Sequence, residues 1–253
     1  MPAPVTPSTE AQLIEVFSSI QGEGLLVGCR QIFLRFALCN LDCDYCDTPF
    51  APQADCRIED AAGSGNFRSL ANPVGLELLY NILFQWHQGA PGMHHSIALT
   101  GGEPLLHGEV LGEWLPALRR LLPIHLETNG TLPDALSPLL AHLDWIAMDI
   151  KLASVTGLPT PWAAHRAFLA QLRGARDQVK LVVGEETPAE ELSQAACLVH
   201  EVAPETPLVL QPVTRQGQIT IGSRQLLDLQ ARVAAIHPIV RVIPQTHRFI
   251  GLL

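Results

Sequence analysis

Three closely spaced cysteines are the residues of this sequence with the clearest chemistry. They are Cys39, Cys43 and Cys46, separated by three and then two residues. Cysteine thiolates are the usual ligands of iron–sulfur clusters, and three thiolates leave one iron of a four-iron cluster open to another ligand. A zinc site would need a fourth cysteine or a histidine, commonly from a second pair that this chain lacks. The spacing favours a cluster over zinc or three unrelated thiols.

The composition indicates a folded protein with a large core. Hydrophobic residues make up 47% of the 253-residue chain and charged residues 16%. The formal net charge of −9, from 16 Lys+Arg and 25 Asp+Glu, argues against nucleic acid and favours a small-molecule substrate. We find no leader pattern and no apolar run of spanning length, so we expect a cytoplasmic protein with no membrane partner.

A glycine-rich motif follows the strand pattern at 96–99. It reads Thr100-Gly101-Gly102-Glu103-Pro104. The glycines can present bare backbone to a ligand, and the glutamate can accept a hydrogen bond from an ammonium group. Alone the motif is only a turn, but after the cysteine loop it resembles the radical S-adenosylmethionine (SAM) enzymes. That resemblance implies a [4Fe–4S] cluster on the three cysteines, SAM chelated by the free iron, and a 5′-deoxyadenosyl radical that abstracts a substrate hydrogen.

The same resemblance implies a set of SAM contacts. Polar residues follow the strand patterns at 124–126 and 145–148, where a barrel of parallel strands places its site. These residues would meet the ribose and carboxylate of SAM, the alternatives being helix caps and salt bridges. The expected SAM contacts are Tyr45, Asp47, Gly102, Glu103, Glu127, Asn129, Asp149 and Lys151.

Two further sequence features indicate one family within the radical SAM enzymes. The strand pattern at 13–17 leads into Gln21-Gly22-Glu23-Gly24, and Arg35 interrupts the apolar run that leads into the cysteines. The planar guanidinium of Arg35 matches a carboxylate, although it can also make a salt bridge between elements. With the Thr48 that follows the cysteines, these residues resemble the 7-carboxy-7-deazaguanine synthase family.

This family resemblance implies a reaction and its partners. The reaction converts 6-carboxy-5,6,7,8-tetrahydropterin to 7-carboxy-7-deazaguanine, a queuosine precursor, by hydrogen abstraction at C6, ring contraction and loss of ammonia. It implies an external electron donor such as flavodoxin or ferredoxin, a homodimer, and Mg²⁺ held by Thr48, whose hydroxyl is otherwise an ordinary turn group. The expected substrate contacts are Ile20, Gln21, Gly22, Glu23, Arg35, Thr100 and Gln211.

The end of the chain also resembles this family. Residues 244–248 read Pro-Gln-Thr-His-Arg, with Arg248 in place of the family's usual lysine. His247 can be a site residue or a hydrogen-bonded surface histidine, and we favour the surface histidine. Cys29, Cys56 and Cys197 are interpreted as ordinary thiols.

Strand and helix patterns alternate along the chain and predict an α/β fold. With the family resemblance, we expect a partial or modified (β/α) TIM-like barrel. We expect a flexible tail at 1–10 and one radical SAM core domain at 11–253, with a loop insertion near 51–74. The expected strands are 13–17, 31–37, 96–99, 124–126, 145–148, 179–183, 208–210 and 240–243, and the expected helices 75–87, 113–122, 133–142, 162–172, 188–202 and 224–236.

Two other functions remain open from the sequence. One is another radical SAM enzyme, such as a glycyl-radical-enzyme activase, which would need a protein partner. The other is a non-catalytic metal-binding module.

Overall fold

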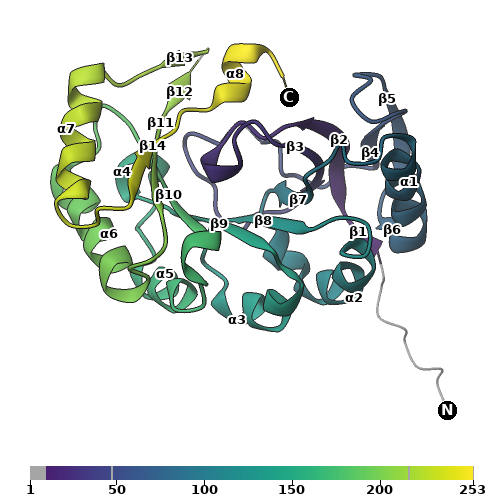
Figure 1. Cartoon of the computed structure of the whole chain (residues 1–253), viewed down its shortest axis with the longest axis horizontal. Helices are drawn as coiled ribbons and strands as arrows, with labels where there is room; N and C mark the ends of the chain where they lie inside the picture. Colours follow the sequence, from purple (N-terminus) through teal and green to yellow (C-terminus); the bar gives the residue numbers. More distant parts are fainter. Residues whose placement is uncertain (1–9, 47, 216, 253) are drawn as a thin grey trace.

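A ten-stranded sheet forms the centre of the computed structural model, which describes residues 10–46, 48–215 and 217–252 (Figure 1). The sheet order is β14-β11-β10-β9-β8-β7-β3-β2-β4-β5. The strands are β2 (Leu13–Ile20), β3 (Arg30–Phe36), β4 (Asp55–Glu59), β5 (Phe67–Ala71), β7 (Ser96–Gly101), β8 (Ile124–Thr128), β9 (Trp145–Ile150), β10 (Gln178–Val183), β11 (Leu208–Pro212) and β14 (Val240–Val242).

Seven neighbouring strands, from β14 to β3, run parallel. Helices connect most of them, as parallel pairing requires. The longer helices are α1 (Leu76–Gly89), α2 (Gly108–Leu118), α5 (Trp162–Leu169), α6 (Ala189–Val202) and α7 (Ser223–Ala234). The shorter ones are α3 (Pro133–Leu136), α4 (Ala153–Thr156), α8 (Thr246–Ile250) and 3₁₀ turns at Gly24–Leu26, Pro104–His107, Ser137–His142 and Gly174–Arg176.

The sheet has two chemically different faces because side chains alternate along each strand. Residues on the outer face are apolar and pack under the helices; Leu34, Leu99 and Leu126 are fully buried there. Their neighbours on the inner face are often polar, such as Arg35, Thr100 and Glu127. The sequence therefore builds a core on one side of the sheet and leaves a polar surface on the other.

The sheet is open. Its terminal strands, β14 and β5, do not pair with each other in the described part of the chain. The predicted α/β fold with a partial barrel is confirmed, and every strand and helix that the sequence predicted appears within a few residues, except that α2 begins five residues early and 133–142 is a short helix followed by a 3₁₀ turn.

The expected loop insertion at 51–74 is wrong over much of its length. Strands β4 and β5 pair antiparallel there and extend the main sheet beyond β2. Cys56 and Ile58 are buried while Asp55 and Arg57 are exposed, a period of two that a short polar strand hides well. The carboxylate of Glu59 then accepts from the backbone N–H groups of Gly63 at 2.8 Å and Gly65 at 2.9 Å, which fixes the hairpin.

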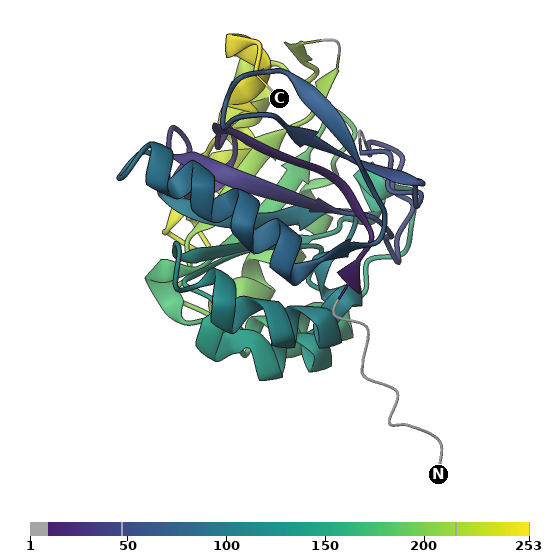
Figure 2. The same ribbon diagram turned by 90° about the vertical axis from the view of Figure 1, so that its right-hand side faces the viewer.

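Small elements that the sequence did not reveal complete the fold. Glu10, assigned to the tail, instead begins β1 (Glu10–Ala11), which pairs with β6 (Val74–Gly75); the rest of the predicted tail lies outside the described residues. A hairpin of β12 (Thr214–Arg215) and β13 (Gln218–Ile219) follows β11. Helix α1 lies against the outer face of the β2–β4 end of the sheet (Figure 2). None of the helices formed by the described residues has the length and apolar character needed to span a bilayer.

Candidate active site

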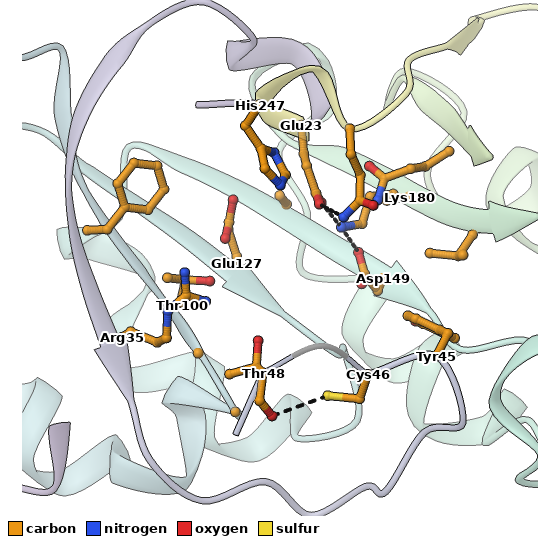
Figure 3. A pocket seen from close by; sticks show the side chains of 18 of the residues that line it. Glu23, Arg35, Tyr45, Cys46, Thr48, Thr100, Glu127, Asp149, Lys180 and His247 are labelled. Carbon is orange, nitrogen blue, oxygen red and sulfur yellow. Dashed lines mark hydrogen bonds and ion pairs between the residues drawn. The ribbon is translucent and has the colours of Figure 1, made fainter. Parts of the chain in front are cut away.

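A pocket of about 740 Å³ opens on the inner face of the sheet (Figure 3). Strands β2, β3 and β7–β11 line it, together with the cysteine loop and residues 245–248. The sequence-predicted residues in its lining are Ile20, Gln21, Gly22, Glu23, Arg35, Cys39, Cys43, Tyr45, Cys46, Thr48, Thr100, Gly102, Glu127, Asn129, Asp149, Lys151 and Gln211. Of the remaining predictions, Glu103 does not line the pocket and Asp47 lies outside the described residues.

Backbone contacts hold the cysteine loop against the end of β7. The N–H of Gly102 donates to the carbonyl of Phe36 at 3.0 Å, and the N–H of Glu103 donates to the carbonyl of Leu38 at 2.8 Å. A Cβ atom on Gly102 would overlap the Leu38 carbonyl, and Gly101 has a φ of +119°. The two glycines are therefore required for this close packing.

The three cysteines fit an iron–sulfur cluster. All are free thiols in the lining of one pocket, and they come from one short loop. Burial raises the pKa of the Cys39 and Cys43 thiols. No three His, Cys, Asp or Glu side chains among the described residues are grouped to hold a single metal ion. In a cluster each cysteine binds a different iron, so a three-cysteine loop satisfies a cluster without such a group.

Glu103 is fully buried, and its carboxylate is hydrogen-bonded within the protein. Its buried carboxylate accepts from the N–H of Leu105 at 3.0 Å, the hydroxyl of Thr128 at 2.8 Å and the N–H of Asn129 at 2.7 Å. Burial raises the pKa of Glu103 to about 7, even though these hydrogen bonds act in the opposite direction. Glu103 thus anchors the turn after β8 from behind the pocket.

Asn129 connects that turn to the cysteine loop. Its side-chain amide donates to Asn40 Oδ1 at 2.8 Å and lies 3.9 Å from Cys39 Sγ. The amide nitrogen of Asn40 donates in turn to the Thr131 hydroxyl at 2.8 Å. The position of Cys39 therefore depends on the turn that Glu103 holds.

A chain of charged groups crosses the pocket, and its central member, Lys180, was not among the residues predicted from the sequence. The ammonium of Lys180 lies 2.5 Å from Glu23 Oε2 and 3.3 Å from Asp149 Oδ1 (Figure 3). Asp149 Oδ2 accepts from Lys151 at 2.8 Å, and Lys151 also donates to the Tyr45 hydroxyl at 2.9 Å. The only signal in the sequence was one lysine inside the apolar run of residues 178–183.

Charge compensation sets the protonation of this chain of groups. Burial opposes ionisation of Glu23, but Lys180 outweighs it and lowers the pKa of Glu23 to about 2. Burial likewise disfavours the ammonium forms of Lys151 and Lys180, but Asp149 outweighs it and raises both pKa values. Glu23, Lys151 and Lys180 are therefore charged at neutral pH.

A second group of contacts joins the Gln21–Glu23 turn to β8 and to the end of the chain. Gln21 donates from Nε2 to Glu127 Oε1 at 2.7 Å. Gln245 donates to Glu23 Oε1 at 2.8 Å, and the N–H of Thr246 donates to the Gly22 carbonyl at 2.8 Å. Glu127, expected beside SAM, therefore shares its hydrogen bond with the turn expected to contact substrate.

His247 lines this pocket, so its position favours the site residue of the two alternatives that the sequence left open. A Cβ atom on Gly22 would overlap the His247 ring, which explains why the turn has glycine at this position. Figure 3 shows the imidazole beside Glu23 and above Glu127.

Two predicted substrate contacts, Gln211 and Arg35, have polar atoms that the protein leaves without a partner among the described residues. The buried Gln211 Oε1 has no hydrogen-bond partner among the described residues, although its residue lines the pocket. Arg35 Nε donates to Glu15 Oε1 at 2.7 Å, which is the salt bridge that the sequence left open as an alternative. Both residues retain polar groups that a bound molecule can satisfy.

Comparison with known proteins identifies the family. Residues 35–167 match the model of the Radical SAM superfamily, which is more than half of the chain. A 7-carboxy-7-deazaguanine synthase from Geobacter sulfurreducens is 48% identical over 96% of this chain and 98% of its own length. Another, from Methanothermobacter thermautotrophicus, is 36% identical with 96% and 98% coverage. The chain belongs to the 7-carboxy-7-deazaguanine synthase family.

The fold agrees with this family. The solved structure of QueE from Escherichia coli superposes with a TM-score of 0.59 at 20% identity, covering 94% of this chain and 95% of that one. That of Streptococcus suis SuiB bound to S-adenosylmethionine gives a TM-score of 0.53 at 16% identity over 86% of this chain. The family membership makes the chain a radical SAM enzyme that uses a [4Fe–4S] cluster and SAM.

Proposed function

We propose that the chain converts 6-carboxy-5,6,7,8-tetrahydropterin to 7-carboxy-7-deazaguanine and ammonia. The observation that carries this proposal is that one pocket contains both the cysteine loop and the Gln21–Glu23 turn. Generic radical SAM activases share the cysteines but lack the turn, so the turn favours this reaction over a glycyl-radical-enzyme activase. A purely metal-binding module would need no ordered polar pocket beside its metal.

The cofactor side of the pocket comprises the cysteine loop and the turns after β7, β8 and β9. Cys39, Cys43 and Cys46 would hold the cluster, which when bound supplies the electron that cleaves SAM. The other residues that line this side of the pocket would orient SAM and exclude water. The proposed SAM contacts are Tyr45, Gly102, Glu103, Glu127, Asn129, Asp149 and Lys151, with Asp47 outside the described residues. Glu103 also holds the backbone of the turn after β8.

The substrate side comprises the inner face between β3 and β11. The orphaned Gln211 Oε1 would accept a hydrogen bond from an N–H of the pterin, since a buried acceptor without a partner costs roughly 1–3 kcal/mol. Gln21 holds one oxygen of Glu127 in place and leaves the other oxygen for a bound molecule. Ile20, Gly22, Glu23, Arg35 and Thr100 complete the proposed substrate contacts.

Thr48 is the proposed Mg²⁺ ligand. Its residue lines the pocket between the cysteine loop and Arg35 (Figure 3). Mg²⁺ prefers oxygen ligands and retains several waters, so one hydroxyl and the substrate carboxylate form a reasonable set with water. The metal would bring the carboxylate end of the substrate to the cofactor side.

The remaining assignments concern the protein as a whole. We propose an external one-electron donor such as flavodoxin or ferredoxin, a homodimer, and a cytoplasmic location. One continuous sheet from β5 to β14 supports a single core domain.

Product formation tests the proposal. The protein is reconstituted anaerobically and incubated with reductant, SAM, Mg²⁺ and 6-carboxytetrahydropterin, and the products are analysed by mass spectrometry. We expect 7-carboxy-7-deazaguanine, and we expect much less of it from Arg35→Ala and Thr48→Ala. Cleavage of SAM without this product would contradict the substrate assignment, and the absence of both a cluster and cleavage would contradict the cofactor assignment.

A further inference from the structure

Arg57 lies at the edge of the pocket, on a strand within the segment that the sequence pattern predicts to be a loop. It belongs to β4, and its Cα is in register with that of Glu15 on β2. Its guanidinium lies 3.6 Å from Glu15 Oε2, while Arg35 Nε lies 2.7 Å from Glu15 Oε1. One carboxylate therefore holds two arginines, one on each oxygen.

Aromatic rings support both guanidiniums. Arg57 lies over the ring of Phe67 at 4.4 Å, and Arg35 lies over the ring of Phe17 at 5.6 Å. Phe17 stacks on Phe33, and Phe67 packs against the same small apolar cluster. Cation–π contacts of this kind restrict where a guanidinium can lie. The two arginines are thus held in fixed positions beside each other.

The charges of this group indicate what it binds. Arg35 and Glu15 are largely buried, with 22% and 11% of their side chains exposed, and they neutralise each other as a pair. A neutral pair attracts a further carboxylate only weakly. Arg57, whose side chain is 58% exposed, adds one positive charge to the group and remains open to the pocket.

We propose that Arg57 is a specificity-determining residue, which with Arg35 forms a carboxylate subsite for the 6-carboxylate of the substrate. Glu15 orients both guanidiniums, and Arg57 supplies the net positive charge that the Arg35–Glu15 pair lacks. Among the described residues, no group accepts a hydrogen bond from the terminal nitrogens of Arg35, so its fork is open to a carboxylate. This proposal rests on the proposed function.

Equilibrium dialysis of two pterins against the reconstituted holoenzyme tests the subsite. One pterin is 6-carboxypterin and the other is pterin without a carboxylate. We expect Arg57→Met to weaken binding of 6-carboxypterin about 10-fold, the scale of one charge-assisted hydrogen bond after screening by solvent, and to change binding of pterin less than about 2-fold. Arg57→Lys keeps the charge but loses the planar fork, so we expect about a 3-fold loss.

Arg68→Met is the matched control. Arg68 lies on the neighbouring strand β5, pairs with Asp60 at 3.5 Å and does not line the pocket. Its loss removes the same charge from the same part of the sheet, and we expect less than about a 2-fold change in the affinity for either pterin because solvent and salt screen the distant charge.

Steady-state kinetics give a second test of Arg57. The KM for 6-carboxytetrahydropterin should rise in Arg57→Met with little change in kcat.

Two results would overturn the proposal. One is an equal loss of affinity for both pterins in Arg57→Met, which would indicate a general structural effect. The other is a loss in Arg68→Met as large as that in Arg57→Met, which would indicate long-range charge alone. A wild-type enzyme that prefers 6-carboxypterin but forms no 7-carboxy-7-deazaguanine would instead contradict the proposed function and leave the subsite standing.

Discussion

At the scale of single residues, the site depends on buried charges that compensate one another. Lys180 lies between Glu23 on the substrate side and Asp149 on the cofactor side. Removing one partner of such a group leaves an uncompensated charge in a poorly hydrated place. We therefore expect Lys180 to position residues of both sides.

Lys180→Met tests this positioning role. Because Glu23 would lose its ammonium partner and Asp149 would keep only Lys151, we expect the free energy of unfolding to fall by about 3 kcal/mol and kcat/KM to fall with it. Urea unfolding and steady-state kinetics measure the two effects. Lys180→Arg keeps the charge and should recover most of the stability; wild-type stability in Lys180→Met would show that the ion pairs contribute nothing.

Glu23 gives a prediction about pH. Its pKa is about 2 in the folded protein against an ordinary value of 4.5, so its contribution to stability is complete above about pH 4.5 and is lost as the pH falls towards 2. At neutral pH we expect the free energy of unfolding of the wild type to exceed that of Glu23→Gln by on the order of 3 kcal/mol. Urea unfolding at decreasing pH should show this difference shrinking below about pH 4.5; a difference independent of pH would contradict the ion pair.

The sequence predicted the lining residues much better than it predicted their partners. The cysteines, the Gly-Gly motif and the Gln21–Glu23 turn have local patterns, and all of them line the pocket. Lys180 and Arg57 lack such patterns because their roles arise from contacts with residues distant in sequence, Glu23 and Glu15. The hydrogen bonds of Glu103 lack a local pattern for the same reason: its partners Thr128 and Asn129 lie on the next strand and turn.

At the scale of elements, the junction between β7 and the cysteine loop sets the position of the cofactor side. Gly102→Ala would force the new methyl group into the Leu38 carbonyl and move the loop. We expect a marked loss of iron and of cluster absorbance per chain after reconstitution. Gly112→Ala, in α2, is the control, because its added methyl group meets only Leu139 at 4.0 Å and should stabilise the helix by about 0.5–1 kcal/mol. Equal cluster content in both variants would contradict this account.

The end of the chain forms the opposite wall of the pocket. Removing residues 245–253 deletes the hydrogen bonds that Gln245 and Thr246 make to the Gln21–Glu23 turn, and it deletes His247. We expect the shortened protein to keep its cluster and cleave SAM without forming product. Mass spectrometry of 5′-deoxyadenosine and of 7-carboxy-7-deazaguanine measures both reactions. Full product formation would show that this segment is dispensable.

At the scale of the whole molecule, the alternation of side chains determines both the fold and the function. The apolar residues of this alternation form clear patterns in the sequence, which is why the parallel strands and their helices were predicted closely. The alternation was harder to recognise in β4, because this short strand is largely polar and Asp55 and Arg57 alternate with Cys56 and Ile58. The open sheet with a polar inner face provides room for a cofactor and a substrate in one pocket.

The central claim is that this pocket brings C6 of the tetrahydropterin next to bound SAM. Substrate carrying deuterium at C6 is incubated with the reconstituted enzyme, SAM and reductant. The deuterium content of the 5′-deoxyadenosine is then measured by mass spectrometry. We expect the deuterium to appear in 5′-deoxyadenosine as 7-carboxy-7-deazaguanine forms. Cleavage of SAM to 5′-deoxyadenosine that contains no deuterium would contradict the placement of C6 and with it the arrangement of the two sides of the site.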